Sequence, residues 1–570
     1  MESLGCVSVI CSDKTGTLTQ NKMTVQNIYT NGQTITIDQL NLKNQLHRYL
    51  LYDAILTNDS SIVDGKGIGD PTEFALVEMG RKATVDENLL RELMPRLEEI
   101  PFDSDRKLMS TKYELHDVPT VLTKGALDVL LDRTVKIRME EGIRDITQED
   151  REAILQKNLE FSQEGLRVLA FGYKEVPEDY TLSLDNENDF IFLGLISMMD
   201  PPREESKAAV ADAKRAGIKP VMITGDHKIT ATAIAKQIGI FEDGDIAMTG
   251  RELDAMSEEE LDRKITEISV YARVSPENKI RIVDAWQRRG SITAMTGDGV
   301  NDAPALKKAD IGVAMGITGT EVAKEAGDIV ILDDNFQSIG KAILYGRTIF
   351  KSIRKFIVFQ LTMNLCAVGV SVIGPFIGID TPVTVMQMLW INIIMDTLAA
   401  LAYAGEAPLE EYMEEPPKKR DEPIFTSAML HQVLCMGLYT ILLCLAFLKL
   451  PLLTQVLSPR QASFHLLTGF FALFIFCGVF NSFNARTERL NLLAHLGKNP
   501  RFLLIMIMVG LVQCLLIYRG GSLFRTSPLP LPAFQLVLLL AFSVIPVDFV
   551  RKLILRRGPG GRLRRSRSPF

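Results

Sequence analysis

The chain has 570 residues, of which 47% are hydrophobic and 23% are charged, and its formal net charge at pH 7 is −7. This length allows about three or four domains, while the modest acidic charge argues against nucleic acid as a main partner. The seven cysteines show neither metal-ligand spacing nor a pairing pattern, which favours reduced, space-filling thiols.

The first predicted element is a buried parallel strand over residues 7–10, which leads into the sequence CSDKTGTLTQ at residues 11–20. Asp13 therefore lies at the carboxyl end of a strand, where open α/β sheets bind their ligands. A carboxylate at this place can attack phosphorus and carry a covalent acyl phosphate. Lys14 can neutralise phosphoryl oxygens, and Gly16 lets the backbone approach closely. An isolated Asp-Lys-Thr would more often be a turn or a helix cap.

The ten-residue string as a whole resembles the phosphorylation signature of the P-type cation ATPases. Related phosphatases carry a second aspartate two residues after the nucleophile, as a general acid and base that helps to release the phosphate. Thr15 occupies that position here. The resemblance therefore implies a phosphorylated Asp13 that persists, as a pump requires and a phosphatase does not.

A polar segment over residues 31–190 interrupts the predicted catalytic sheet and contains four short motifs. Each motif alone is more typical of a surface turn or of the core. In this order after Asp13, they resemble the ATP-binding domain of P-type pumps. The resemblance implies that Phe102 stacks on adenine, Glu73 approaches the base, Lys107 and Lys124 line the pocket, and Arg167 reaches toward the phosphates. An aromatic ring suits a purine and cations suit a polyphosphate, and no P-loop sequence is present.

Strands and helices alternate again from residue 191 to residue 352, which predicts a doubly wound parallel sheet. The strand over residues 191–196 is expected to re-enter the catalytic sheet. The order of the motifs resembles the haloacid-dehalogenase-like fold, with an inserted α+β nucleotide-binding domain and an all-α membrane domain behind it. The segment 221–226 ends a strand in Thr224, Gly225 and Asp226, whose hydroxyl and amides suit phosphate oxygens.

The resemblance also implies roles for residues farther along this region. Lys279 would balance the charge of Asp13, and Asp298 would bind Mg²⁺ together with the Asp13 carboxylate and the Thr15 carbonyl. Asn301 and Asp302 would orient this cluster, and Arg273 would join the nucleotide pocket. The catalytic set is therefore Asp13, Lys14, Thr15, Thr224, Gly225, Asp226, Lys279, Asn301 and Asp302.

Beyond residue 355 the chain is divided into apolar runs with few charges. A spanning helix needs about 20 apolar residues, which predicts six spans over 356–379, 383–403, 424–448, 464–483, 502–518 and 534–547. The basic connections fall on one side, which the positive-inside rule makes cytoplasmic. The predicted domains are a phosphorylation domain (1–30 and 191–352), a nucleotide-binding domain (31–190), a membrane domain (353–550) and a basic cytoplasmic tail (551–570).

Asp396 is a carboxylate within a predicted span, where charge is costly and marks function by default. Asn392 lies on the same helical face, and Asn364 on the preceding span adds another oxygen. Oxygen ligands favour a hard cation such as Ca²⁺ or Mn²⁺. The surrounding sequence resembles the plasma-membrane-type calcium ATPases. Two-ion reticulum pumps have Glu and Thr where this chain has Ala367 and Met395, so the resemblance implies a single ion site.

The resemblance covers nearly the whole chain, yet family members carry an actuator domain and four spans before the phosphorylation strand. Only residues 1–6 precede that strand here. We therefore expect an N-terminally truncated pump, or one whose remaining parts a second chain supplies. Two functions stay open, namely ATP-driven cation transport and ATP·Mg²⁺ binding without turnover. The short tail favours a bacterial plasma membrane, with the catalytic domains in the cytoplasm.

Overall fold

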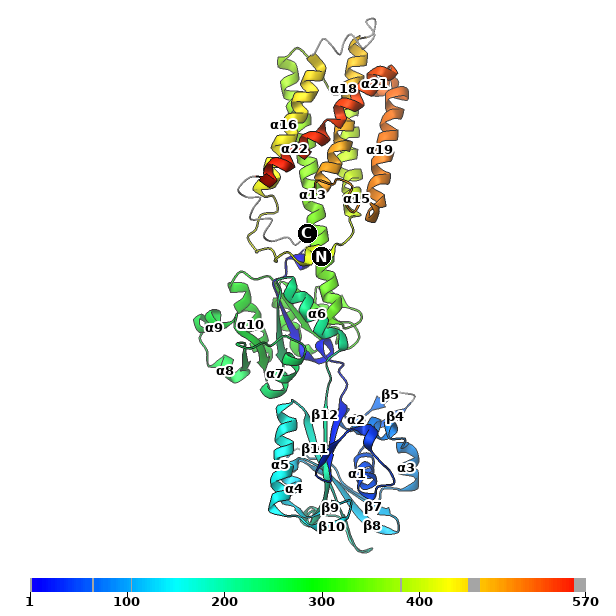
Figure 1. The fold of residues 1–570 in the computed structure, drawn as a ribbon, viewed down its shortest axis with the longest axis vertical. Coiled ribbons are helices and arrows are strands. Elements are labelled where there is room, and N and C mark those ends of the chain that lie inside the picture. Colours follow the sequence, from blue (N-terminus) through cyan, green and yellow to red (C-terminus); the bar gives the residue numbers. More distant parts are fainter. Residues whose placement is uncertain (1–2, 64–65, 104, 380–381, 450–461, 558–570) are drawn as a thin grey trace. The chain divides into compact units, whose positions relative to one another are not determined.

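The chain folds into two units, described by a computed structural model over residues 3–63, 66–103, 105–379, 382–449 and 462–557. Val7–Lys341 form the first unit, and the described residues before and after this range form the second. The first unit holds two large β-sheets and the second is helical (Figure 1). The mixed α/β character predicted for the polar part of the chain is therefore confirmed.

The first sheet has seven parallel strands in the order β14-β15-β13-β1-β16-β17-β18. Four of its strands are buried along their whole length, because helices cover a parallel sheet on both faces. Its strands are β1 (Val9–Asp13), β13 (Lys219–Thr224), β14 (Ile246–Thr249), β15 (Ile268–Ala272), β16 (Thr293–Gly297), β17 (Ile311–Met315) and β18 (Ile329–Ile331). The predicted parallel sheet is confirmed.

The helices between these strands follow the expected alternation. They are α6 (Glu204–Arg215), α7 (Lys228–Gln237), α8 (Gly250–Asp254), α9 (Glu258–Lys264), α10 (Pro276–Arg288), α11 (Ala303–Lys308) and α12 (Glu321–Ala326). Several begin at a residue whose side chain caps the helix. Ser275 accepts a hydrogen bond from the Asn278 N–H at the start of α10, and Pro276 occupies its first position.

The second sheet has nine strands, with the path β10-β9-β12-β11-β8-β7-β6 and with β2 and β3 attached through β12. Most pairs are antiparallel, whereas β12 and β9 are parallel. Its strands are β2 (Thr24–Thr30), β3 (Gln33–Ile35), β6 (Glu98–Ile100), β7 (Leu108–Leu115), β8 (Val118–Gly125), β9 (Thr134–Met139), β10 (Gly142–Asp145), β11 (Arg167–Glu175) and β12 (Phe190–Met199). A separate hairpin pairs β4 (Ser61–Val63) with β5 (Lys66–Ile68).

Alternate residues of this sheet face two different cores, as the period of a strand requires. Leu122 and Phe171 pack with α1 (Gln45–Leu56), α2 (Pro71–Lys82) and α3 (Glu87–Leu93). Val121 and Ala170 pack with α4 (Leu127–Asp132) and α5 (Gln148–Gln163) on the other side.

The strand expected to return to the catalytic sheet does not do so. Residues 191–196 lie in β12, which pairs with β11, β2 and β9 of the second sheet. A continuous apolar run shows that a strand is buried but not which sheet it joins, so that interpretation was wrong.

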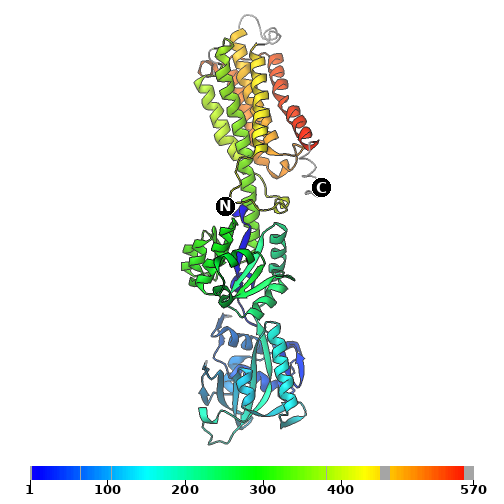
Figure 2. The same cartoon turned by 90° about the vertical axis from the view of Figure 1, so that its left-hand side faces the viewer.

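Among the described residues, five helices are long and apolar enough to cross a membrane. They lie in the helical part of the chain drawn in Figure 2. These are Phe336–Phe376, Ser427–Lys449, His465–Arg486, Pro500–Arg519 and Leu531–Arg556. They correspond to α13 (Phe336–Phe376), α16 (Ser427–Lys449), α18 (Ala462–Arg486), α19 (Pro500–Arg519) and the pair α21 (Leu531–Phe542) and α22 (Val544–Arg557). A short helix, α20 (Gly521–Phe524), follows α19.

The second predicted span is not among these five helices. It consists of α14 (Val385–Asn392), the π-helical segment η6 (Ile393–Leu398) and α15 (Ala399–Ala404). These pieces follow one another without a gap as one helical run over residues 385–404, so the sixth span stays a prediction. A π-helical turn inserted in an α-helix is frequent at functional sites, and here it includes the predicted ion ligand Asp396.

A buried ion cluster joins four helices of the second unit just after α15. Glu406 contacts the Lys355 Nζ of α13 at 2.7 Å and the Arg486 Nε of α18 at 2.9 Å. The Asn499 Nδ2, at the start of α19, donates to Glu406 at 2.9 Å and to the Ala402 carbonyl at 3.1 Å. The side chains of Glu406 and Arg486 are only 9% and 2% exposed. Burial alone would raise the pKa of Glu406, but Lys355, Asn499 and Arg486 bring that pKa below its ordinary value.

Candidate active site

Asp13 ends the central strand of the seven-stranded sheet. Its neighbours β13 and β16 run parallel to β1, so that their carboxyl ends meet at the same edge. The Asp13 N–H donates to Thr296 Oγ1 at 3.1 Å, and the Ser12 and Thr296 hydroxyls lie 3.2 Å apart. These contacts fix the backbone of Asp13 and leave its carboxylate to project beyond the sheet, as the sequence predicts for a ligand-binding edge.

Lys279 joins two buried carboxylates at this edge. Its Nζ lies 2.7 Å from Asp13 Oδ2 and 2.5 Å from Asp302 Oδ1. Burial lowers the pKa of Lys279, but Asp13 and Asp302 more than offset this effect, so that its pKa lies above the ordinary value. The cation therefore stays charged and balances part of the acidic charge, as predicted for Lys279.

Asp302 is held from its other side by the backbone. Its Oδ2 accepts the N–H groups of Asp298 at 3.2 Å and Gly299 at 3.0 Å. Gly297 has to be glycine here, since a Cβ would lie 2.4 Å from the Asp302 Cβ. Both carboxylate oxygens of Asp302 are thus occupied, which makes it an organiser of the loop more than a free ligand.

Asp13, Asp298 and Asp302 form an acidic cluster whose ligand oxygens lie within 4.8 Å of one another. Burial, followed by repulsion from Asp13 and Asp302, raises the pKa of Asp298 to about 6. Burial also raises the pKa of Asp13, opposed by Lys279 and reinforced by Asp302. Oxygen ligands with excess negative charge fit a hard divalent cation such as Mg²⁺, which would relieve this repulsion.

The turn after Asp13 is held by its own backbone and by two acidic residues. Gly16 has φ +75°, which a glycine adopts without strain, and the Thr15 N–H donates to Asp13 Oδ1 at 3.3 Å. Lys14 is buried, and its Nζ lies 2.9 Å from Asp226 Oδ2 and 3.7 Å from Asp200 Oδ2. The structure therefore places Lys14, Thr15 and Asp226 close to the strand end that carries Asp13.

The segment Asp200–Arg203 also belongs to this site, although its sequence by itself predicts only a hinge after a strand. Asp200 Oδ2 accepts the Thr19 hydroxyl at 2.5 Å. Arg203 Nη2 donates to the Gly16 carbonyl at 2.8 Å, and its Nε donates to the Thr19 carbonyl at 3.2 Å. The string Asp-Pro-Pro-Arg directly after a strand was the available signal, because charged residues beside two prolines fix a rigid turn.

Thr224 and Gly225 lie at the end of β13, next to β1. Two other predicted site residues, Arg273 and Asn301, have fewer contacts with the site. The Thr224 hydroxyl accepts the Asp226 N–H at 3.1 Å. Arg273 is exposed, has φ +50°, and donates its N–H to the Asp226 carbonyl at 3.1 Å. Asn301 is also exposed, and no hydrogen bond among the described side chains joins it to the acidic cluster.

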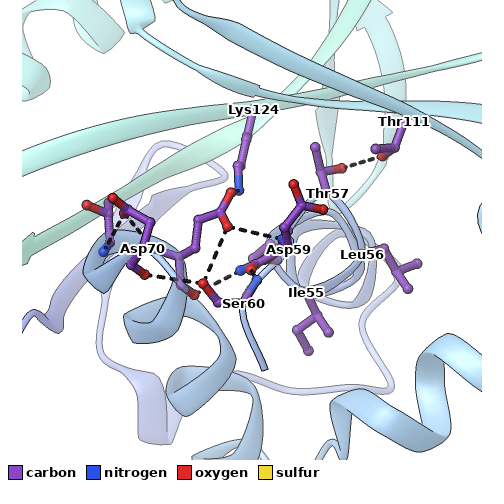
Figure 3. A network of polar contacts seen from close by, with 12 residues as sticks. Ile55, Leu56, Thr57, Asp59, Ser60, Asp70, Thr111 and Lys124 are labelled. Carbon is purple, nitrogen blue, oxygen red and sulfur yellow. Dashed lines mark hydrogen bonds and ion pairs between the residues drawn. The ribbon is translucent and has the colours of Figure 1, made fainter. Parts of the chain in front are cut away.

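Two of the predicted nucleotide-binding residues, Glu73 and Lys124, form an ion pair beside the second sheet. Figure 3 shows Lys124 pointing toward the network of polar contacts that includes Asp59, Ser60 and Asp70. Lys124 Nζ lies 2.5 Å from Glu73 Oε1, and the other Glu73 oxygen accepts the Asp59 N–H at 3.1 Å. Arg167 Nη1 donates to the hydroxyl of Thr72, next to Glu73, at 2.8 Å. Burial lowers the pKa of Lys124, with Glu73 opposing it.

Lys107 lies against the end of β8, close to Gly125, and Phe102 lies five residues before Lys107 in the sequence. The Lys107 carbonyl accepts the Ala126 N–H at 3.0 Å, and a Cβ on Gly125 would lie 2.2 Å from that carbonyl oxygen. Gly125 is thus needed for close approach of the two chains. Phe102 is 60% exposed, an unusual exposure for an aromatic ring unless a partner covers it.

The described contacts do not join the three predicted ion ligands of the second unit, Asn364, Asn392 and Asp396, into a site. The side chain of Asp396 lies outside the described residues. Asn392 is exposed and Asn364 is half-buried, and no described hydrogen bond joins them. Ala367 is buried at 5% exposure and offers no side-chain oxygen.

Two segments match family models. Residues 47–205 match the model described as P-type ATPase, cytoplasmic domain N, and residues 380–554 match cation transporting ATPase, C-terminus. A calcium-transporting ATPase of Listeria monocytogenes is 47% identical over 466 residues, which are 81% of this chain and 52% of the relative. Calcium-transporting ATPase 1 of Bacillus cereus is 40% identical over 568 residues (97% and 64%), and plasma membrane-type calcium-transporting ATPase 5 of Oryza sativa is 36% identical over 588 residues (97% and 53%). The chain thus spans about half the length of most of these relatives.

Proposed function

The chain belongs to the P-type cation-transporting ATPases, and from this membership we propose that it carries the ATP-binding and phosphorylation machinery and part of the membrane machinery of a calcium pump. The transport cycle would also use the segments that make up the rest of the relatives' length, within a longer polypeptide or on a second chain. The relatives' names favour Ca²⁺ over Mn²⁺ as the transported ion, while the oxygen ligands predicted from the sequence suit either ion.

We assign the seven-stranded sheet to a haloacid-dehalogenase-like phosphorylation domain and the nine-stranded sheet to a nucleotide-binding domain inserted into it. The placement of β1 between β13 and β16 supports this discontinuous arrangement. Because β2 and β12 pair within the second sheet, both boundary strands go with the nucleotide-binding domain rather than with residues 1–30 and 191–352. The part of α13 from residue 353 onward and the helices that follow it form the membrane domain, in a bacterial plasma membrane, followed by a basic cytoplasmic tail.

The observation that carries the proposal is the buried triad of Asp13, Lys279 and Asp302 at the carboxyl edge of the sheet. In this proposal an Asp13 oxygen attacks the γ-phosphorus of ATP, forming an oxygen–phosphorus bond as the bond to ADP breaks. Lys279 holds the Asp13 carboxylate in place and offsets the charge that arrives with the phosphoryl group. Lys14 and the N–H groups that follow Asp13 face the phosphoryl oxygens.

Asp13, Asp298 and the Thr15 carbonyl would hold Mg²⁺, which would neutralise phosphate charge when bound. Thr15 carries no group that can activate water. The phosphate on Asp13 is therefore expected to persist until another part of the pump directs water to it.

Substitution of Asp13 tests the phosphorylation chemistry. Asp13→Asn keeps the size of the side chain but removes the nucleophilic carboxylate, so incorporation of ³²P from γ-labelled ATP into the 570-residue chain should fall to background. Asp212→Asn, an exposed carboxylate on α6, should label as the parent chain does. A hydroxylamine-sensitive label of undiminished amount in Asp13→Asn would contradict the proposal. Absence of label in the parent chain, with ATP still bound, would favour the alternative of nucleotide binding without turnover.

Substitutions in the second sheet test nucleotide binding. Loss of an aromatic platform costs about 1–3 kcal/mol per stacked base, so Phe102→Ala should weaken ATP binding about tenfold. Lys124→Met should weaken it by a similar factor, because it removes a cation and leaves Glu73 without its partner. Calorimetric titration of ATP checks both values. Leu155→Ala removes another exposed hydrophobic side chain, from α5, and should bind ATP normally. Normal binding by both site variants would remove the assignment.

A further inference from the structure

A loop behind the proposed phosphorylation site is organised by one buried carboxylate, Asp334. This residue is 1% exposed and lies between β18 and α13. Its Oδ1 accepts the N–H groups of Gly316 at 2.7 Å and Ile317 at 3.0 Å. Its Oδ2 accepts the N–H of Thr318 at 2.7 Å and the Thr318 hydroxyl at 2.9 Å. Three consecutive backbone N–H groups thus form a concave anion site, which the protein fills with its own carboxylate.

In the part of the chain that the structure describes, only these hydrogen-bond donors stabilise the negative charge of the Asp334 carboxylate. Among the described residues, no Lys, Arg or His forms an ion pair with it. Burial by itself raises the pKa of Asp334, but the N–H groups of Ile317 and Thr318 and the Thr318 hydroxyl outweigh it, and the pKa lies below its ordinary value. Asp334 also has φ +49°, a conformation that a residue other than glycine adopts at a cost. Strain of this kind persists where the surrounding structure over-determines it and is concentrated at functional sites.

The loop that Asp334 holds forms one wall of the acidic cluster. A Cβ on Gly16 would lie 3.1 Å from Thr318 Oγ1 and 3.3 Å from an Asp298 carboxylate oxygen, so that both groups flank the turn after Asp13. Two residues farther on, the Thr320 N–H donates to the Asp298 carbonyl at 2.8 Å. Thr318 therefore packs against the Asp13 turn, while Thr320 holds the backbone of Asp298.

We infer that Asp334 is a positioning residue for the divalent-metal site, acting through residues 316–320 on Asp298 and on the Gly16 turn. The inference rests on the proposed function, since it assumes that Asp13 and Asp298 hold the metal. Without the Asp334 carboxylate, three neighbouring N–H groups lose their acceptor and the loop leaves the position from which it fixes Asp298. Residues that orient metal ligands in this way typically change metal affinity by 10- to 100-fold when replaced.

Binding of Mn²⁺, followed by the electron paramagnetic resonance signal of the free ion, tests the inference on the 570-residue chain in detergent. Asp298→Asn defines the component of binding that belongs to this site. In Asp334→Asn the Kd of that component should rise about tenfold. The neighbouring Asp333→Asn is the matched control, because Asp333 is exposed and contacts only Asn335 and Ser338 among the described hydrogen bonds. Its Kd should stay within twofold of the parent value.

Thr318→Val keeps the experiment decisive if Asp334→Asn fails to fold. It removes one of the four hydrogen bonds, worth about 1 kcal/mol, while keeping the contact with Gly16. The Kd should rise about fivefold while the melting temperature measured in EDTA falls by only about 2–4 °C, so that the chain is still folded where binding is measured, a combination that a purely structural role would not give. Normal Mn²⁺ affinity in Asp334→Asn and Thr318→Val, with loss in Asp298→Asn, overturns this inference and leaves the proposed function standing. Unchanged binding in Asp298→Asn overturns the metal site itself, and the inference with it.

Discussion

Lys279→Met is expected to destabilise the first unit strongly and to abolish phosphorylation of Asp13. Lys279 is the cation shared by Asp13 and Asp302, all three of which are buried. Removal of one partner of a buried ion pair typically costs about 3–5 kcal/mol, because the remaining charge stays desolvated. The apparent melting temperature in EDTA should fall by at least about 5 °C, and ³²P incorporation from ATP should fall to background.

The loss of stability in Lys279→Met should depend on pH in a defined direction. Burial and Asp302 already raise the pKa of Asp13 above that of an unfolded chain, and loss of Lys279 raises it further. An acid whose folded-state pKa is raised is destabilising when ionised and is relieved when it binds a proton. The free energy of unfolding that Lys279→Met loses relative to the parent chain should therefore be largest at about pH 8 and smaller at about pH 5.

An exposed lysine of the same unit provides the control for this prediction. Lys228 lies 3.0 Å from Glu252, with both side chains at least 36% exposed. Pairs of this kind contribute less than about 1 kcal/mol, so Lys228→Met should melt and label almost as the parent chain does. Equal melting temperatures for the two lysine variants would show that the buried triad does not hold the site together.

Glu406→Gln is expected to have the largest effect in the helical unit. Glu406 is the shared anion of Lys355 and Arg486, and all three are largely buried. The glutamine can still accept hydrogen bonds, but two buried cations then repel each other without a counter-charge, at a cost of about 3–5 kcal/mol. Thermal aggregation of the detergent-solubilised chain, followed by size-exclusion chromatography, should begin at a clearly lower temperature.

The matched variant for this prediction is Glu411→Gln. Glu411 pairs with Arg489 at the surface, where both side chains are more than 40% exposed, and its loss should shift the transition only slightly. A further variant, Glu406→Gln with Lys355→Met, removes one of the two uncompensated cations and should recover part of the lost stability. If Glu406→Gln aggregated at the parent temperature, the cluster would contribute nothing to the packing of these helices.

The chemistry around Asp13 could be predicted from the sequence because it depends on residue types at the ends of strands. Parallel strands bring their carboxyl ends to one edge, so Asp13, Thr224 and Asp298 had to converge if the strands were recognised. The alternation of strands and helices predicted the parallel sheet, whereas only the family resemblance placed Lys124 and Glu73 at one pocket. The role of Asp334 was not predicted, because it acts through hydrogen bonds to backbone groups 16 to 18 residues away, and such contacts leave no pattern in the sequence. For Asp200 and Arg203 the string Asp-Pro-Pro-Arg indicates a rigid turn, but not that this turn contacts the segment after Asp13.

By itself the sequence determined which segments are strands, which residues are chemically competent, and which stretches are apolar enough for a membrane, since these follow from local composition and periodicity. The tertiary structure decided that β12 joins the second sheet, because every buried strand carries the same apolar signal whichever neighbours it pairs with. It also decided that the helix over residues 385–404 contains a π-helical segment. That segment depends on how backbone hydrogen bonds shift within the packed unit, and hydropathy, which sums side chains alone, does not contain this information.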